Sequence, residues 1–214
     1  MAKYKSLVEI HGTIDNLVFY NLNGIPVVRR KSGFNKNDFE KNPKYAKVRE
    51  NSGEFGHCSK SGKMIRTALQ DYLQDCGDRY LYQKFAQVMT QIKDLDRESP
   101  RGQRTIAKGL QHEGAYGLLY RFRFGIYEGF VGTAARSEGL FGTEIKIKNP
   151  GNYDALELVI LKPDYETYMA ESTIIKQSVL PKQTLYEFEK AEEPGLLYFL
   201  VLKKAGKILN IGFI

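Results

Sequence analysis

The segment 56–63, with the sequence GHCSKSGK, is the part of the chain whose residue types come nearest to a phosphate-binding loop. Such a loop has four residues between its two glycines, and a Ser or Thr follows its lysine to coordinate a metal ion. In this chain five residues separate Gly56 from Gly62, and Met64 follows Lys63. The spacing and the missing hydroxyl therefore argue against a nucleotide site.

The histidines and cysteines are few and scattered. The chain has three histidines, His11, His57 and His112, and its two cysteines, Cys58 and Cys76, have no companion at metal or redox spacing. No Ser or Cys stands in a nucleophile signature. We therefore expect no metal, no cofactor, no small-molecule substrate and no enzymatic activity, with both cysteines reduced and packed as small apolar side chains.

Acidic residues give a weaker signal. Asp94, Asp96 and Glu98 crowd the end of a predicted helix, where carboxylates oppose the helix dipole. We interpret them as solvated charge rather than as a divalent-cation site. Paired acids for glycoside hydrolysis stay open as an alternative, because such residues come together only in the fold.

The net charge of +7 is unevenly distributed along the chain. Residues 1–66 hold 13 Lys and Arg against 6 Asp and Glu, residues 67–125 hold 9 against 7, and residues 126–214 hold 10 against 12. The first third is therefore strongly basic and the last third slightly acidic. This asymmetry suits an anionic partner or the acidic end of another copy of the same chain.

Basic and aromatic side chains alternate in the basic third, where Tyr4, Phe34 and Tyr45 are interspersed among lysines and arginines. Such a mixture can meet phosphates and stack on bases, although no nucleic-acid reading module is present. A solvated face or a protein-binding arm explains the same pattern. The candidate contact residues for assembly or nucleic acid are Lys3, Lys5, Tyr20, Arg29, Arg30, Lys31, Lys36, Lys44, Lys47, Arg49, Lys60, Lys63, Arg66, Arg101 and Arg104.

At 214 residues, with 42% apolar and 27% charged residues, the chain has the composition of an ordinary globular protein. No run approaches the roughly 20 apolar residues of a membrane-spanning helix. The start of the chain lacks the apolar core of a signal peptide. We therefore expect a cytoplasmic protein with no membrane span, without excluding release in an assembled particle.

The N-terminal segment, residues 1–46, is predicted to form a basic β-ribbon and a connector. Strands are expected at 6–10, 17–20 and 25–30, with turns at His11-Gly12 and at 21–24. Residues 31–47 are polar and are interpreted as an extended connector. Three short strands with no helix make a poor core, so the ribbon must lean on the rest of the chain or on a neighbour.

The central segment, residues 47–115, is predicted to be helical. Phe55, Cys58, Ile65, Leu69 and Tyr72 line one face of a first helix, whose start is expected to be broken by glycines up to Gly62. A second helix, with the clearest apolar stripe, covers 81–95 after an N-cap at Asp78. A short third helix opens at Ser99-Pro100 and ends near Gly114.

The C-terminal segment, residues 116–214, reads as an antiparallel β-sandwich. Its strands are expected at 118–124, 144–148, 156–161, 165–170, 184–188, 196–202 and 207–214. In 118–124, Arg121 and Arg123 alternate with aromatic residues, as in a half-buried strand. The whole chain is therefore predicted to be α+β, with an N-terminal β-ribbon, central helices and a C-terminal antiparallel β-sandwich.

The N-terminal half carries short motifs in a fixed order: Met1-Ala2-Lys3 with Lys5, Gly12-Thr13-Ile14, Phe19-Tyr20, Gly24, Arg29 with Lys31, Arg49-Glu50-Asn51, Glu54-Phe55-Gly56, Gly62-Lys63 and Arg101-Gly102-Gln103-Arg104. This series resembles that of a family of uncharacterised bacterial proteins. The resemblance implies a bacterial, non-secreted origin, and it assigns no activity and no functional residue. Asp15 stands where the family tends to have glycine, so the first turn is expected to differ.

These observations favour a non-enzymatic structural protein that forms homo-oligomers. The basic N-terminal arm of one copy would engage the acidic sandwich of the next, which builds a ring, a filament or a component of a phage-like particle. A nucleic-acid-binding protein that uses the basic third is the alternative.

Overall fold

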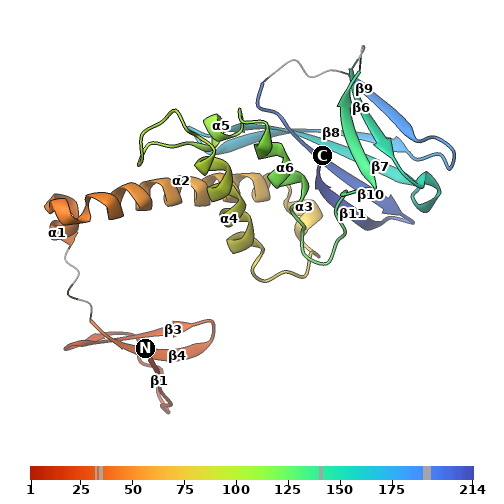
Figure 1. The fold of residues 1–214 in the computed structure, drawn as a ribbon. Helices are drawn as coiled ribbons and strands as arrows, with labels where there is room; N and C mark the ends of the chain where they lie inside the picture. Colours follow the sequence, from red (N-terminus) through yellow and green to blue (C-terminus); the bar gives the residue numbers. More distant parts are fainter. Residues whose placement is uncertain (32, 34–35, 140–141, 190–193) are drawn as a thin grey trace. The chain divides into compact units, whose positions relative to one another are not determined.

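The computed structural model describes residues 1–31, 33, 36–139, 142–189 and 194–214 (Figure 1). It divides into two compact units, Met1–Arg49 and Glu50–Ile214. An N-terminal sheet is followed by helices and then by C-terminal antiparallel sheets, which confirms the predicted α+β class.

The N-terminal unit contains a four-stranded antiparallel sheet in the order β1-β4-β3-β2. Its strands are β1 (Ala2–Lys3), β2 (Gly12–Ile14), β3 (Leu17–Leu22) and β4 (Ile25–Arg30). The predicted strand at 6–10 and the turn at His11-Gly12 are wrong, because Gly12 opens β2 and the chain turns at Asp15, with φ of 52°. The second predicted turn is confirmed. Asn23 and Gly24 both have positive φ, as a tight hairpin turn requires.

Helical turns follow the sheet, so the extended connector predicted at 31–47 is wrong for the described residues of that range. Residues 32 and 34–35, including Phe34, lie outside the described residues. α1 covers Lys36–Lys41 and the 3-10 helix η1 covers Pro43–Tyr45. The Asn42 side chain accepts the Lys44 backbone N–H, so the Asn-Pro pair opens a helical turn. The Arg49 guanidinium donates to the carbonyls of Phe39 and Asn42.

α2 (Ala46–Ala68) is continuous, so the predicted break before Gly62 is wrong. A side chain at Gly53 or Gly56 would meet open space, whereas Gly62 packs against Phe85 and Met89 of the next long helix. Packing against another helix can therefore compensate for the low helix propensity of glycine at Gly62, but not at Gly53 or Gly56. Cys58, Ile65, Leu69 and Tyr72 are buried as predicted, but Phe55 is 61% exposed.

The remaining helices are α3 (Gln70–Leu73), α4 (Leu81–Asp94), α5 (Ile106–Gly109) and α6 (Gly114–Tyr120). α4 is confirmed, and the Asp78 side chain accepts the Tyr80 backbone N–H just before it. Ser99-Pro100 does not open a helix, because Thr105 caps α5 instead. In α5, Gly109 packs so closely on α4 that a Cβ would lie 2.0 Å from the carbonyl oxygen of Ile92.

The strand predicted at 118–124 is also wrong. Residues 118–120 belong to α6, and the segment that follows is irregular. Phe122 and Phe124 are buried while Arg121 and Arg123 are exposed, so the alternation of burial is real. No strand pairs with this segment in the described part of the chain. The alternation therefore reflects the packing of Phe122 and Phe124 into the core, and not the hydrogen bonds of a β-strand.

Seven strands form two antiparallel sheets in the orders β11-β10-β7-β8 and β5-β6-β9. They are β5 (Ala134–Glu138), β6 (Gly142–Ile147), β7 (Ala155–Asp164), β8 (Met169–Ser178), β9 (Leu185–Glu189), β10 (Leu197–Lys204) and β11 (Lys207–Phe213), and the 3-10 helix η2 (Pro150–Asn152) precedes β7. The strand predicted at 165–170 is wrong over 165–168. Asp164 accepts the backbone N–H groups of Glu166 and Thr167 there and stabilises a turn.

The C-terminal unit has three layers, with the four-stranded sheet between the helices and the three-stranded sheet (Figure 1). Phe199 and Val201 of β10 pack with α2 and α4 residues in one core, and Leu200 and Leu202 pack with β6 and β9 residues in the other. Because successive side chains of a strand point to opposite faces, β10 is apolar over its whole buried length.

Candidate functional site

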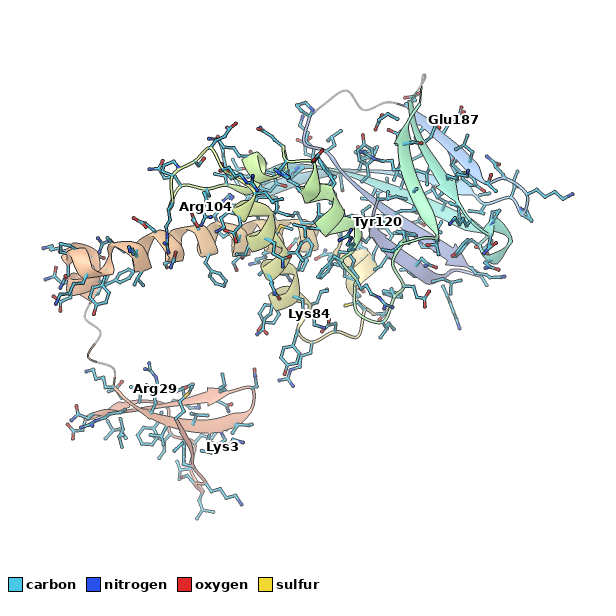
Figure 2. All side chains as sticks on the ribbon, viewed as in Figure 1. Lys3, Arg29, Lys84, Arg104, Tyr120 and Glu187 are labelled. Atoms are coloured by element: carbon cyan, nitrogen blue, oxygen red, sulfur yellow. The ribbon has the colours of Figure 1, made fainter. Side chains whose placement is uncertain are left out.

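One face of the N-terminal sheet combines basic and aromatic side chains. Lys3 of β1 and Tyr20 of β3 both stand opposite Val27 of the intervening strand β4, and Arg29 lies two residues farther along β4. Residues that stand opposite each other in antiparallel strands share a face. We name this the cationic face, defined by Lys3, Tyr20 and Arg29; Figure 2 labels Lys3 and Arg29.

The other face of this sheet is largely apolar. Ile14 stands opposite Leu17 on β2 and β3, and Phe19 stands opposite Val28 of β4. Ile14 is 57% exposed and Leu17 is 44% exposed. We name this the apolar face, defined by Ile14, Leu17, Phe19 and Val28.

The N-terminal unit lacks a hydrophobic core of its own. Among its described residues only Val27 is a buried apolar side chain, while Leu22 and Ile25 are 47% and 42% exposed at the β3–β4 turn. A sheet of short strands needs a covered hydrophobic face to be stable in water. The described residues of this unit therefore leave most of their apolar side chains uncovered.

The other basic candidates of this unit surround the sheet without forming a single site. Lys5, Arg30, Lys31, Lys44 and Lys47 are exposed, and Arg30 lies on the apolar face opposite Leu17. The Lys36 ammonium lies 3.8 Å from the Glu40 carboxylate of the same helix. The Arg49 guanidinium donates hydrogen bonds within its own unit, to the backbone carbonyls of Phe39 and Asn42. The cationic face is the part that gathers aromatic and basic groups.

Five basic candidates lie in the C-terminal unit, and the structure separates them into two groups. Lys60 and Lys63 are exposed on α2. Arg66 is partly buried, and desolvation lowers the pKa of its guanidinium. Arg101 and Arg104 instead join an ion-pair network, described next. The residues are therefore not one continuous basic surface within this unit.

Glu54 of α2 is the centre of a buried network that joins two of the sequence motifs. The guanidinium of Arg104, which is labelled in Figure 2, makes two hydrogen bonds to its carboxylate, at 2.8 Å from Nε and 2.6 Å from Nη2. The Lys93 ammonium donates to the same carboxylate at 2.8 Å, and the Gly102 backbone N–H does so at 2.7 Å. Beside it, Arg101 donates to Asn51 at 2.8 Å.

The electrostatics of this network are balanced. Hydrogen bonds from Arg104, opposed by desolvation and reinforced by Lys93, hold the pKa of the Glu54 carboxyl far below its ordinary value. Arg104 also contacts Asp94 at 2.9 Å, and Lys93 contacts Asp94 at 2.6 Å. A carboxylate that is 3% exposed and fully hydrogen-bonded is suited to holding helices together rather than to moving protons. We therefore interpret Arg101 and Arg104 as structural.

The interpretation of Asp94, Asp96 and Glu98 as solvated charge is wrong for Asp96, whereas the Asp94 side chain is 50% exposed. Asp96 is 3% exposed, and its carboxylate accepts the backbone N–H groups of Ser99 and Thr105, each at 3.0 Å. Asp94 belongs to the Glu54 network. Asp96 thus holds the loop between α4 and α5 in place. The residues around it in the sequence did not predict this role.

A second polar chain joins residues that the sequence analysis did not connect. The Ile106 backbone N–H donates to Nε2 of His57 at 3.1 Å, so that nitrogen carries no proton. Nδ1 of His57 therefore carries the proton and donates it to the Tyr168 hydroxyl, at 3.0 Å. Desolvation, together with the charge of Lys60, lowers the pKa of His57 and keeps the ring neutral. His57 and Tyr168 are 111 residues apart, which hides the pair from local patterns.

The three-stranded sheet carries acidic residues on its outer face. Glu144 of β6 stands directly opposite Glu187 of β9, and Glu189 follows on the same face of β9. Tyr186 and Phe188, which alternate with these glutamates, are buried in the core. Like charges directly opposite one another are destabilising. We name this the acidic face, defined by Glu144, Glu187 and Glu189, and Figure 2 labels Glu187.

No protein-family model, curated protein or solved structure matches this chain. Among the described residues, no three or more His, Cys, Asp or Glu side chains gather in a way that could hold a metal ion. None of the helices in the described part of the chain is long and apolar enough to cross a membrane.

Proposed function

We propose that this chain is a structural, non-enzymatic protein that assembles head to tail through its N-terminal sheet. The observation that carries the proposal is a contrast among the described residues of the N-terminal unit. One apolar side chain, Val27, is buried, whereas Ile14, Leu17, Leu22 and Ile25 are exposed. Covering that surface removes apolar area from water at roughly 25 cal/mol per Å², which gives self-association a driving force.

The acceptor in this proposal is the acidic face of the next copy. Glu144 and Glu187 repel each other within one chain, and a cation placed between them relieves that repulsion. Lys3 and Arg29 of the cationic face supply such cations. Charge complementarity of this kind sets partner choice and orientation.

The geometry of the contact follows from the sheet edges. In the described residues β9 pairs with β6 alone, so its other edge is free to accept a strand beside Glu187 and Glu189. Strand addition combines main-chain hydrogen bonds with specificity from alternate side chains. Donor and acceptor are different surfaces of one chain, so the contact is heterologous and builds rings or open filaments.

A charge-swap experiment tests both surfaces in the full chain. In size-exclusion chromatography with light scattering, the unmodified protein is expected to have a mass above the 24.4 kDa of one chain. The double variants K3E/R29E and E187K/E189K are each expected to lower that mass. A mixture of the two variants should recover it, because every donor then meets an acceptor of opposite charge.

The matched control is K204E/K207E, which changes the same charges at the exposed β10–β11 turn and should leave the mass unchanged. A mass of one chain for the unmodified protein across the concentration range removes the proposal. Failure of the mixture to recover assembly, when both double variants dissociate, removes the acidic face as the acceptor. Electron microscopy of the purified protein shows directly whether rings or filaments form.

The alternative function is binding of single-stranded nucleic acid, and the cationic face favours it. Tyr20 of β3 shares one sheet face with Lys3 of β1 and Arg29 of the intervening strand β4, a combination that can stack on a base and neutralise phosphates. Fluorescence anisotropy with a labelled oligonucleotide should then show binding that weakens steeply as salt rises. Loss of the two charges in K3Q/R29Q should reduce the slope of log K against log salt by about 1.4. No binding at about 50 mM salt dismisses this alternative.

Synthesis in the cytoplasm of a bacterium completes the proposal. Its support is the series of N-terminal motifs, which resembles that of uncharacterised bacterial proteins. Fractionation of cells that express the chain tests the location.

A further inference from the structure

A pocket of about 490 Å³ lies where α2 passes the turn between β7 and β8, inside the C-terminal unit. Its polar lining comes from Lys60, Lys63 and Thr67 of α2 and from Tyr168, while Met64 and Met169 supply much of its apolar wall. The volume is within the range of small-molecule sites, which are concave and mostly apolar with a few placed polar groups.

The charge of the pocket is not compensated by the protein. No Asp or Glu is among the lining residues, and neither Lys60 nor Lys63 forms an ion pair with a carboxylate in the described part of the chain. The Lys60 ammonium instead lies 5.1 Å from the centre of the Tyr168 ring, which positions it beside the pocket. Two ammonium groups beside one hollow favour an anion there.

The hydroxyl of Tyr168, a residue that lines the pocket, can still donate a hydrogen bond. It accepts the Nδ1 proton of His57, whose other ring nitrogen is occupied by the Ile106 N–H. Its own proton is therefore free to be donated to a second acceptor. Tyr168 has φ of 56°, a conformation uncommon for a bulky residue, and the contacts to His57 and Lys60 hold its ring in this conformation.

The apolar side of the pocket decides what kind of anion fits. Met64 is 6% exposed at its base, and Met169 is 70% exposed at its mouth. Methionine side chains are unbranched and adapt to flexible apolar groups. A small inorganic anion would leave this surface in water, whereas an anion with a hydrocarbon tail would cover it.

We propose that this pocket binds an amphipathic organic anion, with a carboxylate or phosphate head group at Lys60, Lys63 and Tyr168 and a hydrocarbon tail against Met64 and Met169. The site is independent of self-association, because all of these residues belong to the C-terminal unit. An assembly-deficient chain such as K3E/R29E should bind the same ligand with the same affinity.

The test is isothermal titration calorimetry of the full chain with decanoate and with decyl phosphate, each below the onset of micelle formation. Saturable binding of either anion is expected, and the two arms distinguish a carboxylate from a phosphate source. Decanol, which has the tail without the charge, and acetate, which has the charge without the tail, should each bind at least about tenfold more weakly, the equivalent of roughly 1.4 kcal/mol.

Variants then locate the site. K60Q/K63Q should weaken decanoate binding at least about tenfold, whereas the charge-matched control K204Q/K207Q should bind as the unmodified chain does. Y168F keeps the ring beneath Lys60 and removes the hydroxyl, so roughly a three- to tenfold loss is expected. Shifts of the His57 ring signals in NMR spectra on ligand addition would place the anion beside it. No saturable binding of either anion, or equal affinity in K60Q/K63Q and the unmodified chain, overturns the proposal.

Discussion

In the C-terminal unit β10 buries side chains on both of its faces, whereas in the N-terminal unit the sheet leaves apolar side chains exposed on both of its faces. Phe199 and Leu200 are neighbours on β10, and each lies in a different core. Within the part of the chain that the structure describes, the ring of Phe19 on β3 packs against Tyr4, at 5.5 Å between centroids. A β-sheet therefore becomes stable only when other layers cover its apolar faces, as the helices and the three-stranded sheet cover β10.

The largest expected difference between the units concerns aromatic core residues. Phe124 is fully buried and its ring lies 4.8 Å from that of Phe122 and 5.3 Å from that of Phe199. F124A should therefore lower the free energy of unfolding by about 3–5 kcal/mol. The matched change F19A should cost less, about 1 kcal/mol, because the Phe19 ring is only partly buried. Urea denaturation of dilute protein measures both, and equal costs would contradict the contrast between the units.

The second difference concerns ion pairs. E54Q removes the charge at the centre of a buried network. It leaves Arg104 without its main acceptor and Lys93 without one of its two carboxylate partners, so we expect a loss of about 3 kcal/mol. E40Q breaks the exposed Lys36–Glu40 pair and should cost at most about 0.5 kcal/mol. Both values come from denaturant titrations at neutral pH.

The pH dependence of the Glu54 contribution has a definite sign. Its pKa is lower in the folded chain than in the unfolded chain, so the carboxyl binds protons more readily when unfolded. The stabilisation is present above about pH 4.5, the ordinary carboxyl value, and is lost as pH falls below it. E54Q should therefore flatten the acid limb of the stability profile, and an unchanged limb would contradict this account.

The third difference concerns tyrosine hydroxyls. The Tyr72 hydroxyl donates to the buried Glu157 carboxylate at 2.8 Å, and that contact, after desolvation, contributes to raising the pKa of Tyr72. Y72F should cost about 1.5–3 kcal/mol, because a charged acceptor loses a donor. Y4F removes the bond from Tyr4 to the Ile10 carbonyl, which is only partly buried, and should cost less than about 1 kcal/mol. Thermal unfolding ranks the two variants.

The smallest difference concerns histidine and pH. Because the pKa of His57 is lowered in the folded chain, protons bind preferentially to the unfolded chain, and stability is lost as pH falls below about 6.5. H57F keeps a ring in place and leaves the Ile106 N–H without its acceptor, which costs about 1–2 kcal/mol at pH 7.5 or so. The variant should also lose the fall in stability between neutral and mildly acidic pH. A stability profile of H57F that still falls between neutral and mildly acidic pH would contradict this account.

The spacing of apolar residues along the sequence was enough to predict the elements with a regular apolar pattern, such as α4 and β10. The stripe of Leu81, Phe85, Met89 and Ile92 gave α4, because one amphipathic face is enough to define a packed helix. The apolar run at 196–202 gave β10, although its burial between two layers could not be inferred from one strand. The break expected in α2 is absent. Gly62 packs against Phe85 and Met89, and a local pattern cannot reveal this contact because the two residues are distant in sequence.

Sites that depend on distant partners could not be predicted. Arg104 was selected as a surface cation, but its partner Glu54 lies 50 residues earlier, so the ion pair exists only in the fold. Arg29 and Lys3 were selected for the same reason, and their common sheet face follows from the pairing of β1 with β4. Glu144 and Glu187 were not selected, since only the register of β6 and β9 brings them together.

The loop from Asp96 to Thr105 is held at three points: by the Asp96 carboxylate, by Glu54 at Gly102, and by the contact of Gly109 with Ile92 just beyond it. A surface connection tied in this way has little freedom to fluctuate on its own. Its backbone amides should exchange with deuterium as slowly as those of α4 and α5, because the loop can open only when these two helices separate from each other. Rigidity here is a property of a loop, not of a helix or a strand.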